Sequence, residues 1–147
     1  MKKLFKTVLL LSFILLTSCG GDKELTLYKS SEPIKDGDVT IKIDRIDEAT
    51  YFNSSYRQYT YISFVNSNPK PVTLKFKDWK VYREKDNAEY GASCITLITG
   101  ELKLECDKET SLSFTTETPT SFSEDNYKLV AHYDSKTLVC HLYDAIV

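Results

Sequence analysis

Apolar and polar residues alternate along several short stretches of this chain, as they do in half-buried β-strands. In residues 39–44, valine and isoleucine occupy every second position and polar residues lie between them. A period of two predicts a strand with one buried face. Residues 56–65 differ because both faces carry apolar or aromatic side chains. We therefore expect residues 56–65 to form a central strand.

The alternation changes phase once, between residues 76 and 79. The apolar positions of residues 72–76 share one face of a predicted strand, whereas Trp79 and Val81 continue in the opposite phase. A β-bulge near residues 77–78 would bring both sets to the same side. The preceding residues 66–71 contain two prolines among asparagine and serine, which predicts a surface loop between two strands.

The second half of the chain continues the pattern of short strands and polar turns. Residues 94–98 and 102–106 flank Thr99-Gly100-Glu101, and a glycine between two β-rich stretches predicts a hairpin. Seven or eight strands without a helical stripe predict an all-β fold, an antiparallel β-sandwich with a small β-barrel as the alternative. The further predicted elements are a strand around Leu112 and Phe114, a polar loop at residues 117–126 and a closing hairpin of residues 127–133 and 138–143.

The first residues have the composition of an export signal. Three lysines precede an apolar run at residues 8–16, and the sequence Leu16-Thr17-Ser18-Cys19 ends the segment. This leader resembles a bacterial lipoprotein signal peptide, cleaved before Cys19. The resemblance implies a diacylglycerol on the Cys19 thiol and acylation of its new amino terminus, with fatty acids such as palmitate. Each buried methylene contributes about 0.8 kcal/mol, so two or three acyl chains would hold the protein on a membrane.

We therefore expect three regions: the signal peptide at residues 1–18, the lipidated cysteine and a tether at 19–37, and the β-sandwich domain at 38–147. Removing 18 of the 147 residues leaves 129, enough for one hydrophobic core. The net charge is −2 before the lysine-containing leader is removed. An acidic chain argues against a nucleic-acid partner, which requires a concentrated positive surface. The expected location is the cell membrane or outer membrane, facing the periplasm or the cell exterior.

Three cysteines remain beside Cys19, so at most one internal disulfide can form. If residues 99–101 form a three-residue hairpin loop, Cys94 lies opposite Cys106. A bridge between them would contribute about 3 kcal/mol in the chain-entropy model. A Cys106–Cys140 bridge is the second possibility. In the third, all three cysteines are reduced and pack as small, buried apolar residues.

The residue types that carry metal and catalytic chemistry do not gather in recognisable motifs. His132 and His141 lie in similar runs on the two closing strands, but alternation turns Cys140 to the face opposite His141. A zinc site needs three or four converging ligands, so we predict no metal and no cofactor. No serine lies in a nucleophile elbow, and the sequence has no glycine-rich phosphate loop and no HExxH motif. We do not expect an enzyme.

One group of aromatic residues lies beside a predicted loop tip at residues 53–55. Tyrosine provides a large contact area at low entropic cost, and loop tips commonly carry binding residues. Tyr51, Phe52 and Tyr56 are therefore the candidate binding surface.

The order of elements and the sequence Tyr-Ile-Ser-Phe-Val-Asn-Ser-Asn-Pro-Lys-Pro-Val-Thr-Leu at residues 61–74 resemble the immunoglobulin-like domain of small bacterial surface lipoproteins of unknown function. The similarity covers residues 39–143. It implies a fold and a location at the cell envelope, and it carries no catalytic residues across. We expect a non-catalytic, membrane-anchored lipoprotein that binds an unknown protein or glycan partner. The alternative function is a small-molecule or metal carrier, and an envelope hydrolase is the third and least favoured function.

Overall fold

The computed structural model describes residues 23–94, 97 and 99–144. The predicted signal peptide at residues 1–18 and the predicted lipidation site Cys19 lie outside the described residues. Within the described part, the chain forms eleven strands and no helix, which confirms the all-β prediction but exceeds the predicted seven or eight strands. The strands are β1 (Lys23–Tyr28), β2 (Ile34–Asp36), β3 (Val39–Ile46), β4 (Thr50–Phe52), β5 (Ser55–Asn66), β6 (Val72–Arg83), β7 (Ala88–Ser93), β8 (Glu101–Leu104), β9 (Glu109–Thr118), β10 (Tyr127–Tyr133) and β11 (Lys136–His141).

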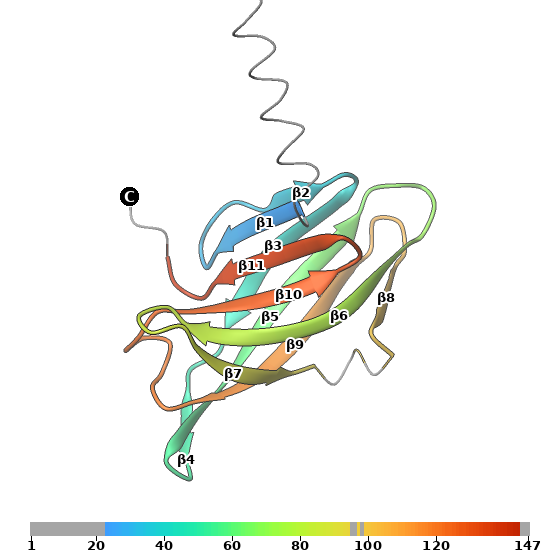
Figure 1. Ribbon diagram of the computed structural model, residues 1–147. Coiled ribbons are helices and arrows are strands. Elements are labelled where there is room, and N and C mark those ends of the chain that lie inside the picture. The colour runs from blue at the N-terminus through green and yellow to red at the C-terminus, as the bar shows by residue number, and fades with distance from the viewer. Residues whose placement is uncertain (1–22, 95–96, 98, 145–147) are drawn as a thin grey trace, which may run out of the picture.

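The strands pack in two layers (Figure 1). β1, β11, β10 and β6 form one layer, and β2, β3, β5 and β9 form the other. β7 joins the layers because its first residues pair with β6 and its last two pair with β9. On the other side, the edge strands β1 and β2 lie close together. The predicted β-sandwich is confirmed. Because β7 joins the two layers on one side and β1 and β2 lie close together on the other, the sheet is nearly closed and also resembles the predicted alternative, a small β-barrel.

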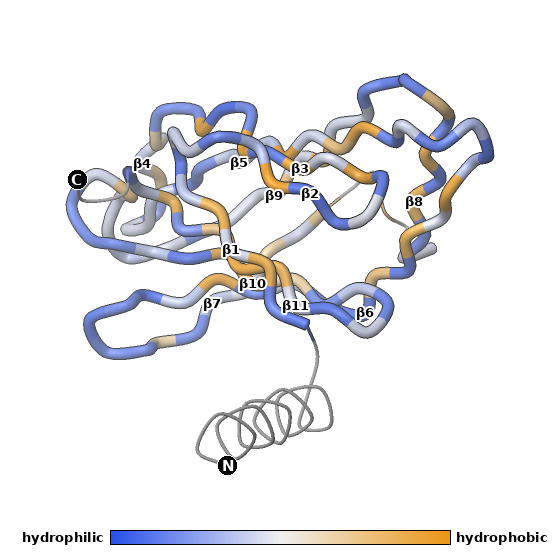
Figure 2. The backbone as a smooth tube through the Cα atoms, turned by 90° about the horizontal axis from the view of Figure 1, so that it is seen from above, coloured by the Kyte–Doolittle hydropathy of each residue, from blue (hydrophilic) through white to orange (hydrophobic). Residues whose placement is uncertain are grey.

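β5 is the central strand, as predicted, because it pairs with β3 along one edge and with β9 along the other. Its inward-facing Ile62 and Phe64 are buried, as is Leu112, the register partner of Ile62 on β9. The rings of Phe64 and Phe76 meet edge to face at 6.1 Å between centroids and so connect the two layers. Figure 2 shows hydrophobic positions along the strands and hydrophilic residues in the connecting loops.

The predicted bulge in β6 is confirmed. The pairing with β10 passes from His132↔Asp78 to Tyr133↔Phe76 and leaves Lys77 as the extra residue. Phe76 and Val81 are both buried, although they lie in opposite phases of the sequence. The bulge therefore turns the two halves of β6 toward the same core.

The sequence pattern predicted that the folded domain begins at residue 38. In the structure, strands begin earlier, at Lys23. β1 pairs along the whole of β11 in parallel, the one parallel strand pair among the described strands. Leu25 and Leu27 of β1 are buried, and β2 pairs with β3. Residues 23–36, expected to belong to a tether, therefore contribute two edge strands and part of the core.

The described residues do not form the hairpin predicted around Gly100; residues 95, 96 and 98 of its first arm lie outside the described part. β8 pairs with the first residues of β6, from Val72↔Leu104 to Lys75↔Glu101, while Cys94 and Leu97 lie outside the strands. Gly100 has a φ of 77°, and an added Cβ would lie 3.0 Å from the Phe76 carbonyl oxygen. The glycine thus permits a close approach to β6 instead of a local two-strand turn.

A buried carboxylate ties the two edges of the sandwich together. Asp36 of β2 is 7% exposed. It accepts hydrogen bonds from Lys136 Nζ of β11 at 2.5 Å and from the Tyr133 hydroxyl of β10 at 2.9 Å, and Lys23 Nζ of β1 lies 3.6 Å away. Burial alone would raise the pKa of the Asp36 carboxyl, but Lys136 and Tyr133 outweigh it and hold that pKa below its usual value. We call these four residues the seam cluster.

We predict that Asp36→Asn lowers the free energy of unfolding by about 2–4 kcal/mol, because it leaves buried donors without a charged acceptor. A depressed carboxyl pKa stabilises the fold above about pH 4, and the stabilisation is lost as pH falls through the folded-state pKa. Urea denaturation between pH 7 and pH 2 should therefore show a weaker acid dependence for Asp36→Asn. Asp44→Asn, at an exposed site, is the control and should stay within about 0.5 kcal/mol of the parent. Equal effects of the two substitutions would contradict the role given to the seam cluster.

Candidate functional site

The two ends of the sandwich differ in what they carry. One end holds Lys23, the first described residue, together with the turn after β2 and the turn between β10 and β11, which the seam cluster brings together. β5 ends there, since Asn66 pairs with Val39. The other end, which we call the distal end, holds the β4–β5 hairpin and the loops at residues 47–49 and 119–126. In Figure 1, β4 and the start of β1 lie at opposite sides of the molecule.

The β4–β5 hairpin has a tight two-residue turn. Thr50 pairs with Arg57, and Phe52 pairs with Ser55. Asn53 and Ser54 between them have φ values of 51° and 63°. Positive φ at both central positions matches the right-handed twist of the flanking strands, so the turn sets the hairpin register. The loop tip predicted at residues 53–55 therefore exists, and it presents the neighbouring aromatic side chains on a defined frame.

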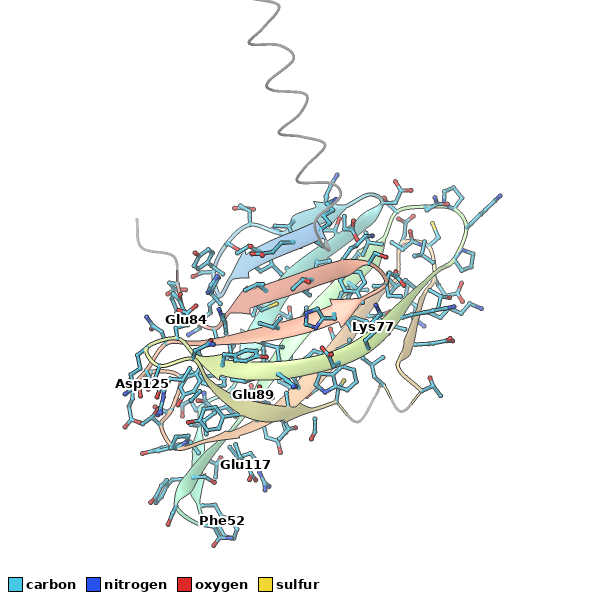
Figure 3. The ribbon with its side chains drawn as sticks, in the orientation of Figure 1. Phe52, Lys77, Glu84, Glu89, Glu117 and Asp125 are labelled. Atoms are coloured by element: carbon cyan, nitrogen blue, oxygen red, sulfur yellow. The ribbon has the colours of Figure 1, made fainter. Side chains whose placement is uncertain are left out.

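The predicted aromatic surface lies on this hairpin, but on two faces. Tyr51 and Phe52 are 63% and 64% exposed, and Phe52 projects at the tip (Figure 3). Tyr51 pairs with Tyr56, and their ring centroids are 5.0 Å apart. Alternation along β4 turns Phe52 to the opposite face. The structure thus brings Tyr51 and Tyr56 together and separates Phe52 from them.

A cleft of about 450 Å³ opens beside the Tyr51–Tyr56 face of the hairpin. Residues 46–49 form one wall and residues 121–123 form the facing wall. Tyr56 and Gln58 of β5 contribute to the lining, together with Lys29 and Leu142. These residues come from five separate parts of the chain, and the strand ends at the distal end bring them together.

Gln58 holds two walls of the cleft in place. Its side chain is buried. The amide nitrogen donates to the Asp47 carbonyl oxygen at 3.2 Å, and the amide oxygen accepts from the Phe122 backbone N–H at 2.7 Å. A buried side chain that satisfies one backbone group in each of two loops positions both loops.

The loop at residues 119–126 is ordered by its own polar side chains. The Ser121 N–H donates to Glu124 Oε2 at 2.9 Å, and the Thr120 hydroxyl donates to Asp125 Oδ2 at 2.7 Å. The Thr120 bond and Lys85 hold the pKa of the Asp125 carboxyl below its usual value. Phe122 is buried within this polar loop. The sequence predicted the loop but not the burial of the Phe122 ring, because the neighbouring residues in the sequence are polar.

An aromatic and polar cluster supports the wall that carries Lys29 and Leu142. The Tyr28 and His141 rings stack at 4.5 Å with an interplanar angle of 19°. His141 Nδ1 lies 2.8 Å from Glu84 Oε1, and the Tyr143 hydroxyl donates to the same carboxylate. Burial and Glu84 raise the pKa of the Tyr143 hydroxyl above its usual range.

The two histidines are paired with carboxylates on the outer face of the β6–β10–β11 layer. His132 Nδ1 hydrogen-bonds to Asp78, and His141 bonds to Glu84. Cys140 is buried on the inner face, as alternation predicted, and burial raises its pKa to about 12. Among the described residues, no three histidine, cysteine or acidic side chains come close enough to hold a metal ion.

The cysteine arrangement differs from the predicted Cys94–Cys106 disulfide. Cys106 is exposed and Cys140 is buried, both as free thiols, and Cys94 is buried. The predicted bridge depended on a hairpin that would place Cys94 opposite Cys106. In the described part of the chain β8 pairs with β6 instead, and that register is not formed there.

A second, shallow hollow of about 510 Å³ lies on the other side of the hairpin, where Arg57, Ser93 and Glu117 are among its lining residues. Arg57 Nη2 donates to Glu117 Oε1 at 2.5 Å. The hairpin is therefore a ridge between two hollows, and successive residues of β5 face one or the other.

No protein-family model matches the sequence, and no curated protein matches it either. Among solved structures, the yjhA protein from Bacillus subtilis is similar to this chain at 13% identity and a TM-score of 0.54, over 79% of this chain and 98% of that one. A candidate lipoprotein from the same species, ycdA, is similar at 13% identity and a TM-score of 0.51, over 78% of this chain but only 39% of that one. An uncharacterized β-sandwich protein from Clostridium difficile has 14% identity and a TM-score of 0.48, over 82% and 93%.

These comparisons show a fold shared with bacterial proteins, one of them a candidate lipoprotein. At this level of identity they carry no residue roles. Among the described residues, no helix has the length and hydrophobicity needed to cross a bilayer.

We predict that Gln58→Ala loosens the cleft. Two backbone groups lose their buried partner, which should lower the free energy of unfolding by about 1–3 kcal/mol. Amide hydrogen exchange should accelerate at Phe122 more than at Leu112 in the core. Gln58→Met, which conserves length but not hydrogen bonding, separates lost packing from lost bonds. Unchanged exchange at Phe122 in both variants would contradict the proposed role of Gln58.

Proposed function

We propose that this protein is a non-catalytic binding module of the cell envelope, anchored through lipid on Cys19, that presents its distal end to a partner. The observation that carries the proposal is the position of the hairpin. The exposed Tyr51 and Phe52 lie at the end of the sandwich opposite Lys23. An anchor attached ahead of Lys23 would therefore leave the hairpin and the cleft facing away from the membrane.

The short distance between the expected anchor and the fold supports this orientation. Only residues 20–22 separate Cys19 from Lys23, the first residue of β1. Three extended residues span about 10 Å. A lipid on Cys19 would thus keep the Lys23 end near the bilayer surface and leave little freedom for the distal end to reach it.

The surface chemistry of the hairpin supports recognition. Large apolar side chains at two-thirds exposure are costly to solvate, and those that gather on one projecting element commonly mark a contact surface. Tyr51 and Phe52, the two most exposed of the large hydrophobic residues described, are neighbours on the projecting hairpin. The tight turn holds the hairpin in one register, so little conformational entropy would be lost on binding.

We expect Cys19→Ala to abolish membrane attachment. Without the thiol no diacylglycerol can be added, and the protein should move from the membrane fraction to the soluble fraction of native cells. Intact mass of the parent protein should show acyl groups on a chain that begins at Cys19. A parent protein that keeps its leader and carries no acyl mass would refute the anchor.

We expect the double variant Tyr51→Ser, Phe52→Ser to lose binding to isolated envelope material while the fold stays intact. The matched control is Tyr59→Ser, which removes an exposed aromatic from β5 beyond the hairpin, where Tyr59 pairs with Thr115 of β9, and which should leave binding unchanged. Co-sedimentation of purified lipoprotein with envelope fractions, at rising protein concentration, measures the saturable component. Equal saturable binding by the parent and the double variant would argue against recognition through the hairpin.

A further inference from the structure

The cleft beside the hairpin combines an aromatic platform with convergent polar groups. Tyr56 lines the cleft, and Tyr51 extends the aromatic surface beyond its rim, with 5.0 Å between the ring centroids. The tilt of 51° between the rings gives two adjoining faces. Phe122 adds a buried ring to the facing wall.

The polar groups at the cleft are mainly acceptors and neutral hydroxyls. Asp47, Glu48 and Ser123 contribute to the lining. Asp47 accepts from Arg45 Nε at 3.2 Å, whereas Glu48 takes part in no ion pair with any described residue. A carboxylate offers two acceptor oxygens in one plane and can receive two neighbouring hydroxyl groups at once.

The charge of the cleft disfavours phosphate-bearing ligands. Lys29 is the one cation among the described lining residues, and Asp47 and Glu48 oppose it. A phosphate ligand needs an excess of positive charge or a cluster of backbone N–H donors. The cleft is also open, and its lining mixes apolar residues such as Ile46 and Leu142 with charged ones such as Glu48, whereas an acyl chain needs an enclosed, mainly apolar site.

The strand pairing disfavours an extended peptide in the cleft. A peptide that adds to a sheet requires a free strand edge whose backbone groups are unpaired. β5 lines the cleft, and in the segment around Tyr56 it pairs with β4 on one edge and β9 on the other. Gln58, the buried amide of the lining, already bonds two backbone groups.

We infer that the cleft binds a stretch of hexose-type glycan, with sugar rings stacked on Tyr56 and Tyr51 and hydroxyl groups bonded to Glu48 and Asp47. A pyranose ring has one apolar C–H face and a rim of hydroxyls, which matches an aromatic platform beside planar acceptors. This inference rests on the proposed function and names the chemical class of the partner.

The test is isothermal titration of the full lipidated protein, in detergent micelles, with four neutral trisaccharides built from glucose, N-acetylglucosamine, galactose or mannose. At least one should bind. Tyr56→Ala should weaken that binding about tenfold, the loss expected for one aromatic contact. Tyr56→Phe keeps the ring and should bind like the parent. Tyr59→Ala, on the opposite face, should also leave binding unchanged.

Glu48→Gln provides a second variant at an exposed position where folding is not at stake. It should weaken the same trisaccharide severalfold, because an amide has one acceptor oxygen in place of two. Lack of binding by all four sugars, or undiminished binding by Tyr56→Ala, would overturn the inference. If envelope binding depends on Tyr51 and Phe52 but is destroyed by protease treatment of the envelope material, the partner is a protein. The proposed function would then stand and the glycan assignment would fail.

Discussion

The double pairing of β5 is the constraint on which the rest of this structure depends. The strand is twelve residues long, and it is held by β3 and β4 on one edge and by β9 on the other. A slip of one residue against both neighbours would expose Ile62 and Phe64 and bury Tyr59 and Tyr61. The register that buries the core therefore also directs Gln58 toward the loops of Asp47 and Phe122. It also places the β4–β5 hairpin beyond the end of the sandwich.

The interior changes character along β5 and β9. Midway along these strands the inward positions are apolar, such as Phe64 and Leu112, and toward the distal end they become Gln58, Thr60 and Thr116. The hydroxyls of Thr60 and Thr116 are buried without a hydrogen-bond partner among the described groups. Buried polar groups of this kind cost stability. The distal ends of β5 and β9 thus depend on specific hydrogen bonds, such as those of Gln58, as well as on apolar burial.

The sequence predicted the elements whose signal is local. The strict alternation in β3 and the phase change in β6 each report burial within a few residues, so the strand and its bulge could be identified. β1 has only two alternating apolar residues, Leu25 and Leu27, and its partner β11 lies at the far end of the chain. The pattern was therefore too short to predict a strand, and the segment was interpreted as a tether. Gly100 suggested a local turn because nothing nearby in the sequence reveals its approach to Phe76.

In the candidate site, too, the features that depend on neighbouring residues could be predicted, and those that depend on distant strands could not. Tyr51 and Tyr56 are close in sequence and beside a turn, so their pairing could be anticipated. The cleft could not, because Lys29, Gln58, Phe122 and Leu142 meet only after the strands have paired. Alternation along β4 and β5 was available in the sequence and separates Phe52 from Tyr51. That separation follows only once residues 50–52 are known to form a strand, and no local pattern identified this short strand.

The parallel pairing of β1 with β11 has a mechanical consequence. Tension on the chain ahead of Lys23, directed away from the molecule, runs along the axis of β1. It would load the backbone hydrogen bonds from Lys23↔Lys136 to Tyr28↔His141 together in shear, not one after another as in peeling. The ionic contacts of Asp36 reinforce the end of β1 that is pulled first. The edge strand that the proposed anchor on Cys19 would pull is therefore joined to its sheet in the geometry that best resists a steady pull.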